Sequence, residues 1–275
     1  MRTLVGILVS LLLASCRAGP PEEGSGDPQG AEGASLEEVL DDPEVARIYR
    51  AMMDTLAPDR GWERTRYLAF DWLVGRENGW LRRSHRWDRV SGDYRVEAPI
   101  GEEGDTMVAL FNVTSPTQGE RVWVNGEPVT DAARADSLAR RAHAWFINDS
   151  YWLLMPYKWA DPGVSASYLG TTDLWGETYE TVELTFDEGV GLTPQNRYRA
   201  YVDPESGVME IWQYFRQSAD TDPGFTLAWT DWQDYGPILL SSRRENEDGD
   251  ARIWFENLRA ETSVPDGAFD PPGGA

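Results

Sequence analysis

The sequence is poor in cysteine, histidine and lysine. Its 275 residues contain one cysteine, Cys16, two histidines, His85 and His143, and a single lysine, Lys158. One cysteine cannot form an internal disulfide, a CxxC redox pair or a thiolate zinc site. Two histidines are too few for a histidine-rich metal centre. We therefore predict no metal site and no bound cofactor.

Basic residues are also scarce. The 25 lysines and arginines face 47 aspartates and glutamates, which gives a formal charge of -22. Nucleic acids and anionic lipid headgroups both require a basic surface, so neither is expected to be the main partner. Apolar residues are plentiful by contrast, at 41% of the chain with thirteen tryptophans. The size suits one large β domain or two small ones.

The one long apolar run lies at the N-terminus. Leu4–Ala14 follows Arg2 and has eleven residues, too few to cross a hydrocarbon core of about 30 Å as a helix. The run is typical of a secretory signal. It ends in Leu13-Ala14-Ser15-Cys16, which resembles the bacterial lipoprotein processing box. That resemblance implies cleavage after residue 15 and a lipid anchor on Cys16, with dual acylation for stable membrane attachment. The alternative is a plain signal peptide with an incidental cysteine.

The expected organisation follows from this assignment. Residues 1–15 form the signal peptide, and residues 16–34, which lack large apolar side chains, form a disordered tether. Arg17 stands where the family's inner-membrane retention signal has Asp, so the resemblance favours an outer-membrane protein that faces the periplasm. Residues 35–262 show no shift in composition and are expected to be a single domain. Residues 263–275, rich in proline and glycine, are expected to be a flexible tail.

Two helices are predicted inside the domain. Ser35–Glu38 fits a capping box, and Asp42-Pro43 begins a helix with Asp as N-cap and Pro at the first position. The second helix is capped by Thr130 or Asp131 and should end near Asn148. The apolar residues at helical spacing are Val45, Ile48, Tyr49, Met52 and Leu56 in the first helix and Ala135, Leu138, Ala142 and Trp145 in the second.

The rest of the domain is predicted to be antiparallel β structure. Val182, Leu184 and Phe186 alternate with polar residues, as expected for a strand with one buried face. Asn125-Gly126 is a strong hairpin signal. Other turn signals lie at 91–93, 203–207 and 246–250. They separate about ten to twelve short strands, a density typical of a sandwich or barrel.

Candidate catalytic groups are few. His85 lies in a predicted strand and His143 on the second helix, and both are interpreted as structural, since no GxSxG turn or activated cysteine accompanies them. Adjacent acidic pairs are unavoidable among 47 carboxylates, so none is assigned to a glycosidase. We predict no catalytic residue and no enzymatic activity.

Two charge features remain open. The stretch Arg60–Arg95 holds nine arginines against five acidic residues. It forms either ordinary cross-strand ion pairs or a basic face for an anionic ligand or partner. Lys158 is the only lysine in a chain that otherwise uses arginine. A lysine stands at this position either by chance or because the position requires a compact ammonium group.

The segment around Lys158 carries a resemblance to a family. Trp145–Lys158, Asp161–Val164, Gly189–Pro194 and Tyr198–Asp203 resemble an uncharacterised family of bacterial secreted and lipid-anchored proteins. That family is in turn similar to the periplasmic lipoprotein carriers and receptors of the LolA/LolB-like fold. The likeness spans roughly Trp62 to Leu258. It implies a mainly β (α+β) domain: a strongly curved antiparallel half-barrel of about eleven strands wrapped around helices.

The resemblance also implies an apolar cavity for acyl chains on the concave face. Wide aromatic and methionine side chains could line it, or they could simply fill the core. Our first hypothesis is a lipid-anchored protein that binds a lipid or another hydrophobic small molecule. The second is an interaction or structural lipoprotein of an envelope complex, and the third is a glycan-acting hydrolase. The oligomeric state is left open. The candidate ligand-binding residues are Trp145, Trp152, Met155, Tyr157, Lys158 and Trp159.

Overall fold

The computed structural model describes residues 40–273 except 77–78 and 102–103. The predicted signal peptide, Cys16, the tether and the capping box at Ser35–Glu38 lie outside the described residues.

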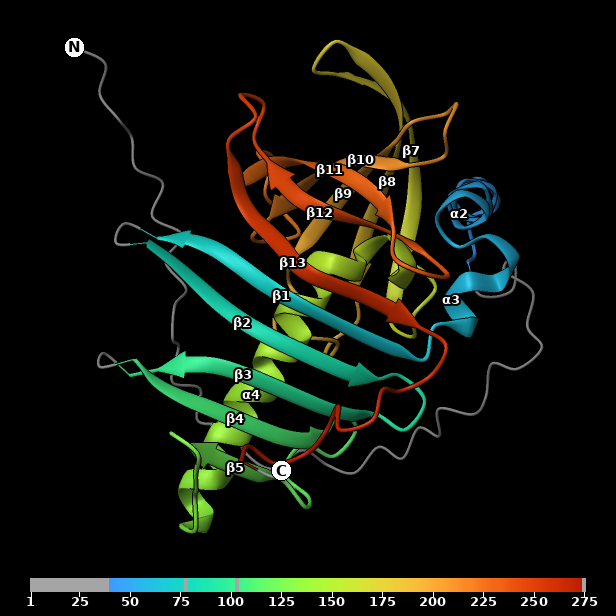
Figure 1. The fold of residues 1–275 in the computed structure, drawn as a ribbon. Helices are drawn as coiled ribbons and strands as arrows, with labels where there is room; N and C mark the ends of the chain where they lie inside the picture. Colours follow the sequence, from blue (N-terminus) through green and yellow to red (C-terminus); the bar gives the residue numbers. More distant parts are fainter. Residues whose placement is uncertain (1–39, 77–78, 102–103, 274–275) are drawn as a thin grey trace. The chain divides into compact units, whose positions relative to one another are not determined.

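Thirteen strands in the described part of the chain form one antiparallel sheet, in the order β6-β5-β4-β3-β2-β1-β13-β12-β11-β10-β9-β8-β7. Strands that are adjacent in the sheet are also consecutive along the chain, with one exception. The pairing of β1 with β13 brings together two distant segments (Figure 1). The strands are Tyr67–Arg76 (β1), Gly79–Asp88 (β2), Asp93–Ile100 (β3), Asp105–Asn112 (β4), Arg121–Val124 (β5), Glu127–Pro128 (β6), Val164–Leu174 (β7), Glu177–Phe186 (β8), Arg197–Val202 (β9), Met209–Phe215 (β10), Phe225–Asp234 (β11), Leu239–Glu245 (β12) and Ala251–Glu261 (β13).

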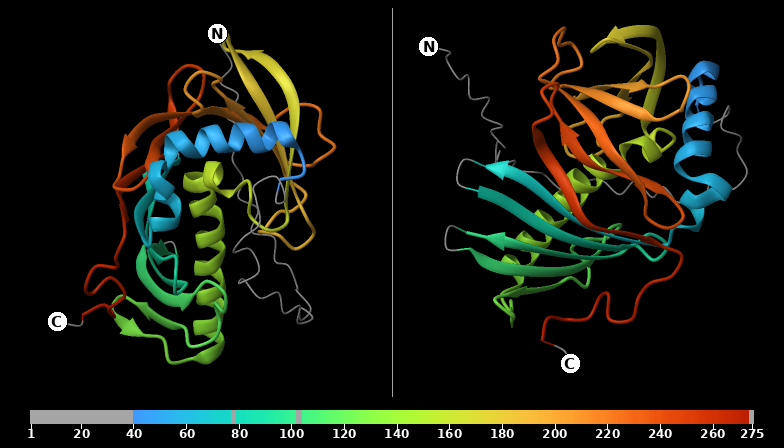
Figure 2. Two further views of the ribbon diagram at one scale, coloured as in Figure 1. Left: turned by 90° about the vertical axis from the view of Figure 1, so that its right-hand side faces the viewer. Right: turned by 45° about the horizontal axis from the view of Figure 1, so that its top comes forward.

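The sheet is open, because β6 and β7 at its two ends do not pair with each other. It curves around the long helix α4 (Ala132–Leu154), which lies along its concave face (Figure 2). The predicted fold class, a curved antiparallel half-barrel wrapped around helices, is confirmed. The strand number exceeds the expected eleven by two, and the short β5 and β6, of four and two residues, account for a difference of that size.

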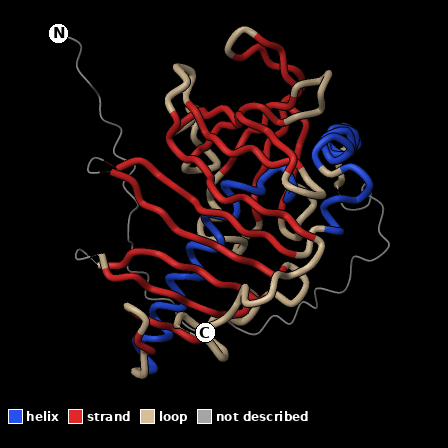
Figure 3. The backbone as a smooth tube through the Cα atoms, in the orientation of Figure 1, coloured by secondary structure: helices blue, strands red, loops and turns tan. Residues whose placement is uncertain are grey.

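The other helices are short or peripheral. They are α2 (Pro43–Leu56), η1 (Pro58–Arg60), α3 (Gly61–Arg64) and η2 (Met155–Lys158). Figure 3 shows that α2 lies beside the sheet end formed by β7, whereas η2 continues α4 directly. The predicted turns are also found. Asn125 and Gly126, with φ of 52° and 83°, join β5 to β6 as the hairpin signal predicts.

The first predicted helix is confirmed as α2. Asp42 is its N-cap and accepts the backbone N–H groups of Glu44 and Val45, with Pro43 at the first position. The predicted apolar stripe is buried along its whole length. The Asp42 carboxylate also accepts the backbone N–H of Tyr168 on β7 at 2.9 Å. One side chain therefore caps the helix and satisfies a donor of the strand at the sheet edge, where donors have no neighbouring strand.

The second predicted helix is confirmed as α4, with a different end. Asp131 caps it by accepting the N–H of Arg134 at 2.8 Å. The helix continues to Leu154, six residues past the expected end at Asn148. Asn148-Asp149-Ser150 looks like a helix terminus because such side chains usually bond to nearby backbone groups. In the folded chain the Asp149 carboxylate bonds to another element, so the helix is not interrupted.

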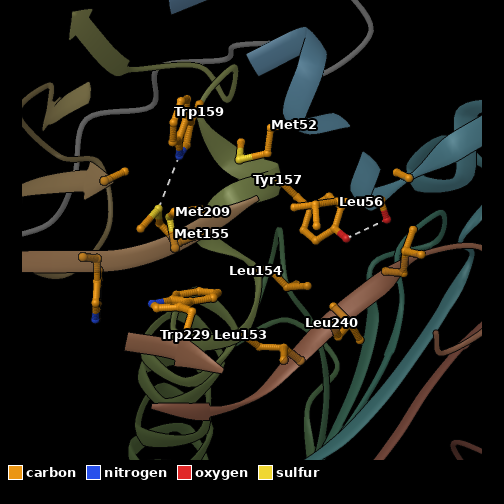
Figure 4. Packing of buried hydrophobic residues seen from close by; sticks show 14 of the residues in the cluster. Met52, Leu56, Leu153, Leu154, Met155, Tyr157, Trp159, Met209, Trp229 and Leu240 are labelled. Carbon is orange, nitrogen blue, oxygen red and sulfur yellow. Dashed lines mark hydrogen bonds between the residues drawn. The ribbon is translucent and has the colours of Figure 1, made fainter. Parts of the chain in front are cut away.

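The main hydrophobic core fills the space between the concave face, α2 and the C-terminal half of α4. Figure 4 shows its centre, where Met52 and Leu56 of α2 meet residues from η2, β10, β11 and β12. A second cluster lies where β3, β4 and β5 cover the first half of α4, around Val96, Ala109 and Ala142.

The described residues after β13, for which composition predicts a flexible tail, make defined contacts with the sheet. Ala268 is only 6% exposed. The Arg86 guanidinium donates to the Ala268 carbonyl at 3.3 Å, and Arg95 donates to the Asp270 carbonyl. Arginines on the sheet bind backbone carbonyls here, which composition alone does not reveal.

The double role of Asp42 yields a prediction. Asp42→Ala should lower the free energy of unfolding by about 1–2 kcal/mol through the lost cap, plus a further loss from the unpaired Tyr168 N–H. Asp131→Ala, which removes a cap without an edge-strand bond, is the matched control. Urea denaturation of both variants measures the difference. Equal destabilisation would mean that the bond to β7 contributes nothing.

Candidate functional site

The interior of the domain contains a buried cluster of charged and polar side chains between α4 and the strands β2 and β3. Asp149 on α4 is 0% exposed and binds Arg83 of β2 through two hydrogen bonds of 2.6 Å each. His85 Nε2 lies 3.0 Å from Asp149 Oδ2, and the Tyr94 hydroxyl lies 2.8 Å from His85 Nδ1. Since an ionised carboxylate only accepts, Nε2 carries the hydrogen and Nδ1 accepts from Tyr94.

The pKa shifts in this cluster favour that assignment. Burial lowers the pKa of His85 more than the hydrogen bond to Asp149 raises it. Burial alone raises the pKa of Asp149, but the hydrogen bond from His85 and the charge of Arg83 outweigh it, so the net pKa is lowered. Burial also raises the pKa of Tyr94. The cluster thus holds a neutral histidine, a neutral tyrosine and one ion pair.

A Tyr–His–Asp chain is familiar from catalytic sites, but this one has no access to substrate. His85 is 1% exposed and contacts the rings of Phe70 and Tyr94, and Asp149 is fully buried. The Arg83 guanidinium lies 4.1 Å from the centre of the Trp72 ring. The interpretation of His85 as structural therefore agrees with its surroundings. His143 similarly bonds to the Val113 carbonyl at 3.0 Å.

A second buried cation, Arg244 of β12, lies at the C-terminal end of α4, about one turn beyond Asp149. It donates to the Trp152 carbonyl in the last turn of the helix at 2.6 Å and 3.1 Å, and to the Ser241 hydroxyl at 2.8 Å. Its guanidinium lies 3.4 Å from the centre of the Trp229 ring. Burial lowers its pKa well below the usual value. A cation at a helix C-terminus interacts favourably with the unpaired carbonyls, so Arg244 holds the end of α4 against the sheet.

Three of the predicted ligand-binding residues belong to the core. Met155, Tyr157 and Trp159 are each at most 2% exposed. Trp159 Nε1 lies 3.3 Å from Met155 Sδ, and the Tyr157 hydroxyl donates to the Leu56 carbonyl at 3.1 Å (Figure 4). These contacts correspond to the alternative that the sequence left open, in which the aromatic segment fills the core.

The other three predicted residues lie in different surroundings. Trp145 is partly buried and its ring lies 5.2 Å from the Arg83 guanidinium. Lys158 forms an ion pair with Asp161, three residues further along the chain, which is an ordinary role for a partly exposed lysine. Only Trp152 stands in a surface that could hold an apolar ligand.

That surface is a partly exposed group of rings at the edge of the concave face, which we call the aromatic rim. Tyr198, Tyr214 and Phe225 pair directly across β9, β10 and β11, so their rings point to the same face. Phe225 stacks on Trp152 with ring centres 5.6 Å apart, and Tyr214 stacks on Phe225 at 4.8 Å. The rim consists of Tyr151, Trp152, Phe186, Tyr198, Tyr214 and Phe225, all partly exposed.

The rim carries no charge of its own at neutral pH. Burial raises the pKa of Tyr151, Tyr198 and Tyr214 above the usual 10.0, so each phenol stays protonated. Trp212 lies behind the rim, 1% exposed and parallel to Tyr198 with ring centres 5.0 Å apart. The rim is therefore an uncharged aromatic surface with a rigid backing, in a chain of formal charge -22.

Sequence reasoning identified only one rim residue, Trp152. Alternation along the strands could have placed Tyr198, Tyr214 and Phe225 on the inner face. Their meeting in one row depends on the register of three strands, which no short-range signal specifies.

Hollows of about 450 and 280 Å³ lie on the surface of the described residues. The larger lies under the C-terminal segment on the convex face, and the smaller between α2 and the turn that joins β9 to β10. Charged side chains line both, including Arg86 and Glu97 in the first and Arg47 and Glu180 in the second. Neither hollow is lined by a predicted ligand-binding residue.

Four of the nine arginines in the stretch Arg60–Arg95 form ion pairs within the described residues. Arg66, Arg82, Arg83 and Arg95 each form an ion pair with a carboxylate. Arg86 and Arg89 instead donate to backbone carbonyls.

Over the described residues, no group of three or more His, Cys, Asp or Glu side chains could hold a metal ion. No helix in that same part of the chain is long and apolar enough to span a membrane.

Comparison with protein families gives one match, over residues 132–244, to a "Family of unknown function (DUF6503)". Comparison with curated proteins gives no match.

Several solved structures are similar in fold. A DUF1329 family protein from Desulfovibrio piger is 15% identical, with a TM-score of 0.41, over 83% of this chain and 98% of the other. A LolA superfamily protein from Nitrosomonas europaea is 11% identical, with a TM-score of 0.45, over 81% and 96%. A domain described as an outer membrane lipoprotein-sorting protein from Vibrio parahaemolyticus is 9% identical, with a TM-score of 0.43, over 84% and 96%. We draw no conclusion about fold or function from likenesses this distant.

The buried ion pair yields a prediction for stability. Asp149→Asn should lower the free energy of unfolding by about 3–5 kcal/mol, because it leaves the Arg83 charge buried without a counter-charge. Asp161→Asn, which removes the partly exposed partner of Lys158, should change it by less than about 1 kcal/mol. Urea denaturation at pH 7 compares the two. A similar small loss for both variants would contradict the assigned role of Asp149.

The two histidines yield a prediction for pH dependence. Burial lowers the pKa of both His85 and His143 below the ordinary 6.5. Stability should therefore be full above pH 6.5 and decrease below it, because the unfolded chain then binds protons that the folded chain excludes. Each histidine contributes at most about 1.4 kcal/mol per pH unit. The lowered pKa of Asp149 adds a further loss only below about pH 3.8.

Urea midpoints between pH 8 and pH 5 test this expectation. His85→Gln should flatten the profile more than His143→Gln, since His85 is fully enclosed and His143 is partly exposed. An unchanged slope in His85→Gln would contradict a lowered pKa of His85, because it would mean that the folded and unfolded chains bind its proton equally.

Proposed function

We propose that this protein is a non-enzymatic binding protein of the bacterial cell envelope. Its acylated Cys16 holds it at a membrane, with the domain facing the periplasm. The domain binds the acyl chain of a lipid, or of a lipid-bearing molecule, across the aromatic rim. The observation that carries the proposal is the rim itself, an uncharged row of partly exposed rings on the concave face of a strongly acidic protein.

The rim differs from the enclosed chamber that the sequence resemblance implies. Met155, Tyr157 and Trp159 occupy the interior, so an acyl chain would lie along the rim and not enter the core. Binding there buries the remaining exposed ring surface, which favours association by about 25 cal/mol for each Å² removed from water. Flat rings with a rigid backing lose little conformational freedom on binding.

A non-enzymatic role agrees with the chemistry of the interior. The Asp149 cluster has its hydrogen bonds satisfied internally and has no access to solvent. The rim offers tyrosine hydroxyls whose pKa is raised by burial, which makes them poor nucleophiles at neutral pH.

A fluorescent fatty acid, dansyl-undecanoic acid, tests the proposal with the full-length protein purified from membranes. Energy transfer from tryptophan to the dansyl group should report saturable binding. Tyr214→Ala and Phe225→Ala should each weaken it about tenfold, the loss expected for about 1.4 kcal/mol of ring contact. Trp80→Ala is the control, because Trp80 is an exposed ring (62%) outside the rim.

Native mass spectrometry of the same preparation should show a lipid retained by the wild type and lost from the rim variants. If the wild type retains no lipid and binds no probe, the lipid-binding proposal is overturned. The interaction-lipoprotein hypothesis would then be the one to pursue.

A further inference from the structure

The convex face of the sheet carries a second site, on the face opposite the aromatic rim, and His85 of the Asp149 cluster is among the residues that line its hollow. The chain leaves β13 at Glu261 and returns across this face, on the side opposite α4 (Figure 2). Residues 265–270 touch β1, β2 and β3, and they cover one side of the hollow of about 450 Å³. We call this stretch the C-terminal segment.

The C-terminal segment has a shape of its own. The Ala268 N–H donates to the Pro265 carbonyl at 3.2 Å, and the Asp270 N–H donates to the Gly267 carbonyl at 3.2 Å. Gly267 has a φ of 72°, a value that favours glycine at the third position of a tight turn. A Cβ at Gly267 would also lie 3.2 Å from Asp270 Oδ2. The segment is therefore a compact double turn that forms from short-range bonds.

The sheet recognises this turn mainly through its backbone. Arg86 and Arg95 donate to the carbonyls of Ala268 and Asp270. Ala268 is 6% exposed, and the Phe269 ring meets the Tyr67 ring edge to face at 6.5 Å. Two guanidinium groups, a small buried methyl group and one ring contact make up this interface.

Arg86 supplies a positive charge at this site that no described carboxylate pairs with, and the acidic Asp71 and Glu97 also line the hollow. The turn carries Asp266 and Asp270, and the sheet presents Arg86, Arg95 and Arg259 around Tyr67. Arg95 and Arg259 are also paired with Glu97 and Glu261. Arg86 forms no ion pair with any described residue, and its recorded bond is the one to the Ala268 carbonyl. Its charge is available for the carboxylate of a bound peptide.

The hollow beside the turn indicates that the site is larger than its occupant. Ser84, Asn257 and Arg259 line this hollow together with residues of the turn. Ser84 has no recorded hydrogen bond from its side chain among the described residues, whereas Asn257 donates to Asp71 at 2.8 Å. A longer peptide could reach these groups, whereas residues 265–270 do not fill the space.

We propose that this convex-face site is a docking site for a short acidic peptide turn of a partner protein. Residues 265–270 occupy it as an internal ligand that the partner's segment displaces. The partner's segment has the same chemistry: a turn with a small residue, an aromatic residue and flanking carboxylates. Because it is tethered, the internal segment competes with an effective concentration in the millimolar range. A partner segment displaces it only if additional contacts in the hollow make its binding stronger.

The test uses the full-length chain and a labelled peptide of residues 263–271, Ser-Val-Pro-Asp-Gly-Ala-Phe-Asp-Pro. Ala268→Arg should release the internal segment, because a long cation cannot enter a buried methyl site that faces arginines. Fluorescence anisotropy should then show the variant binding the peptide at least about tenfold more tightly than the wild type. Binding should weaken as salt screens the charges.

Two further variants keep the outcome clear. Adding Arg86→Gln and Arg95→Gln to Ala268→Arg should abolish binding of the peptide. If Ala268→Arg fails to fold, Phe269→Ala is the milder substitution that should release the C-terminal segment from the sheet. Circular dichroism establishes that each variant is folded. The proposal is overturned if neither release variant binds the peptide more tightly than the wild type, or if binding survives the loss of both arginines.

Discussion

The ion pair between Arg83 and Asp149 is the interaction on which the arrangement of the domain depends. It joins the middle of β2 to α4 in surroundings with no access to water, where an unpaired charge would be strongly unfavourable. His85 and Tyr94 extend it across β2 to β3. Because both charges must meet with good geometry, α4 has one permitted position along the concave face. A purely apolar interface would tolerate sliding or rotation more readily.

Arg244 adds a second constraint about one turn further along, at the C-terminal end of the helix. It holds the last carbonyls of α4 against β12, and the Trp229 ring covers its guanidinium. With α4 held at two points, Tyr151 and Trp152 face β9, β10 and β11, and the aromatic rim follows from that orientation. Because the end of α4 is held in place, the side chains of Met155, Tyr157 and Trp159, which follow it, point into the hydrophobic core. The buried charges thus decide which aromatic residues are accessible and which fill the interior.

The two proposed sites lie on opposite faces of the sheet and use different chemistry. The rim on the concave face is uncharged, and its contacts would be apolar. The convex-face site relies on guanidinium groups that bind backbone carbonyls. A protein with both could hold an apolar ligand on one side and an acidic partner segment on the other. The arginine-rich stretch contributes to both faces, since side chains alternate along β2: Arg83 points inward and Arg86 outward.

The sequence by itself determined the local events. These are the helix start at Asp42-Pro43, the hairpin at Asn125-Gly126 and the burial of Val182 and Leu184 on β8, because each depends on residues a few positions apart. The resemblance around Trp145–Lys158 also led to the correct fold class. Only the tertiary structure decided that Asp149 lies within a helix, that Tyr198, Tyr214 and Phe225 form a row, and that Ala268 is buried. Each of those outcomes requires a partner from a distant segment, and strand register and burial are set by the packing of the whole sheet.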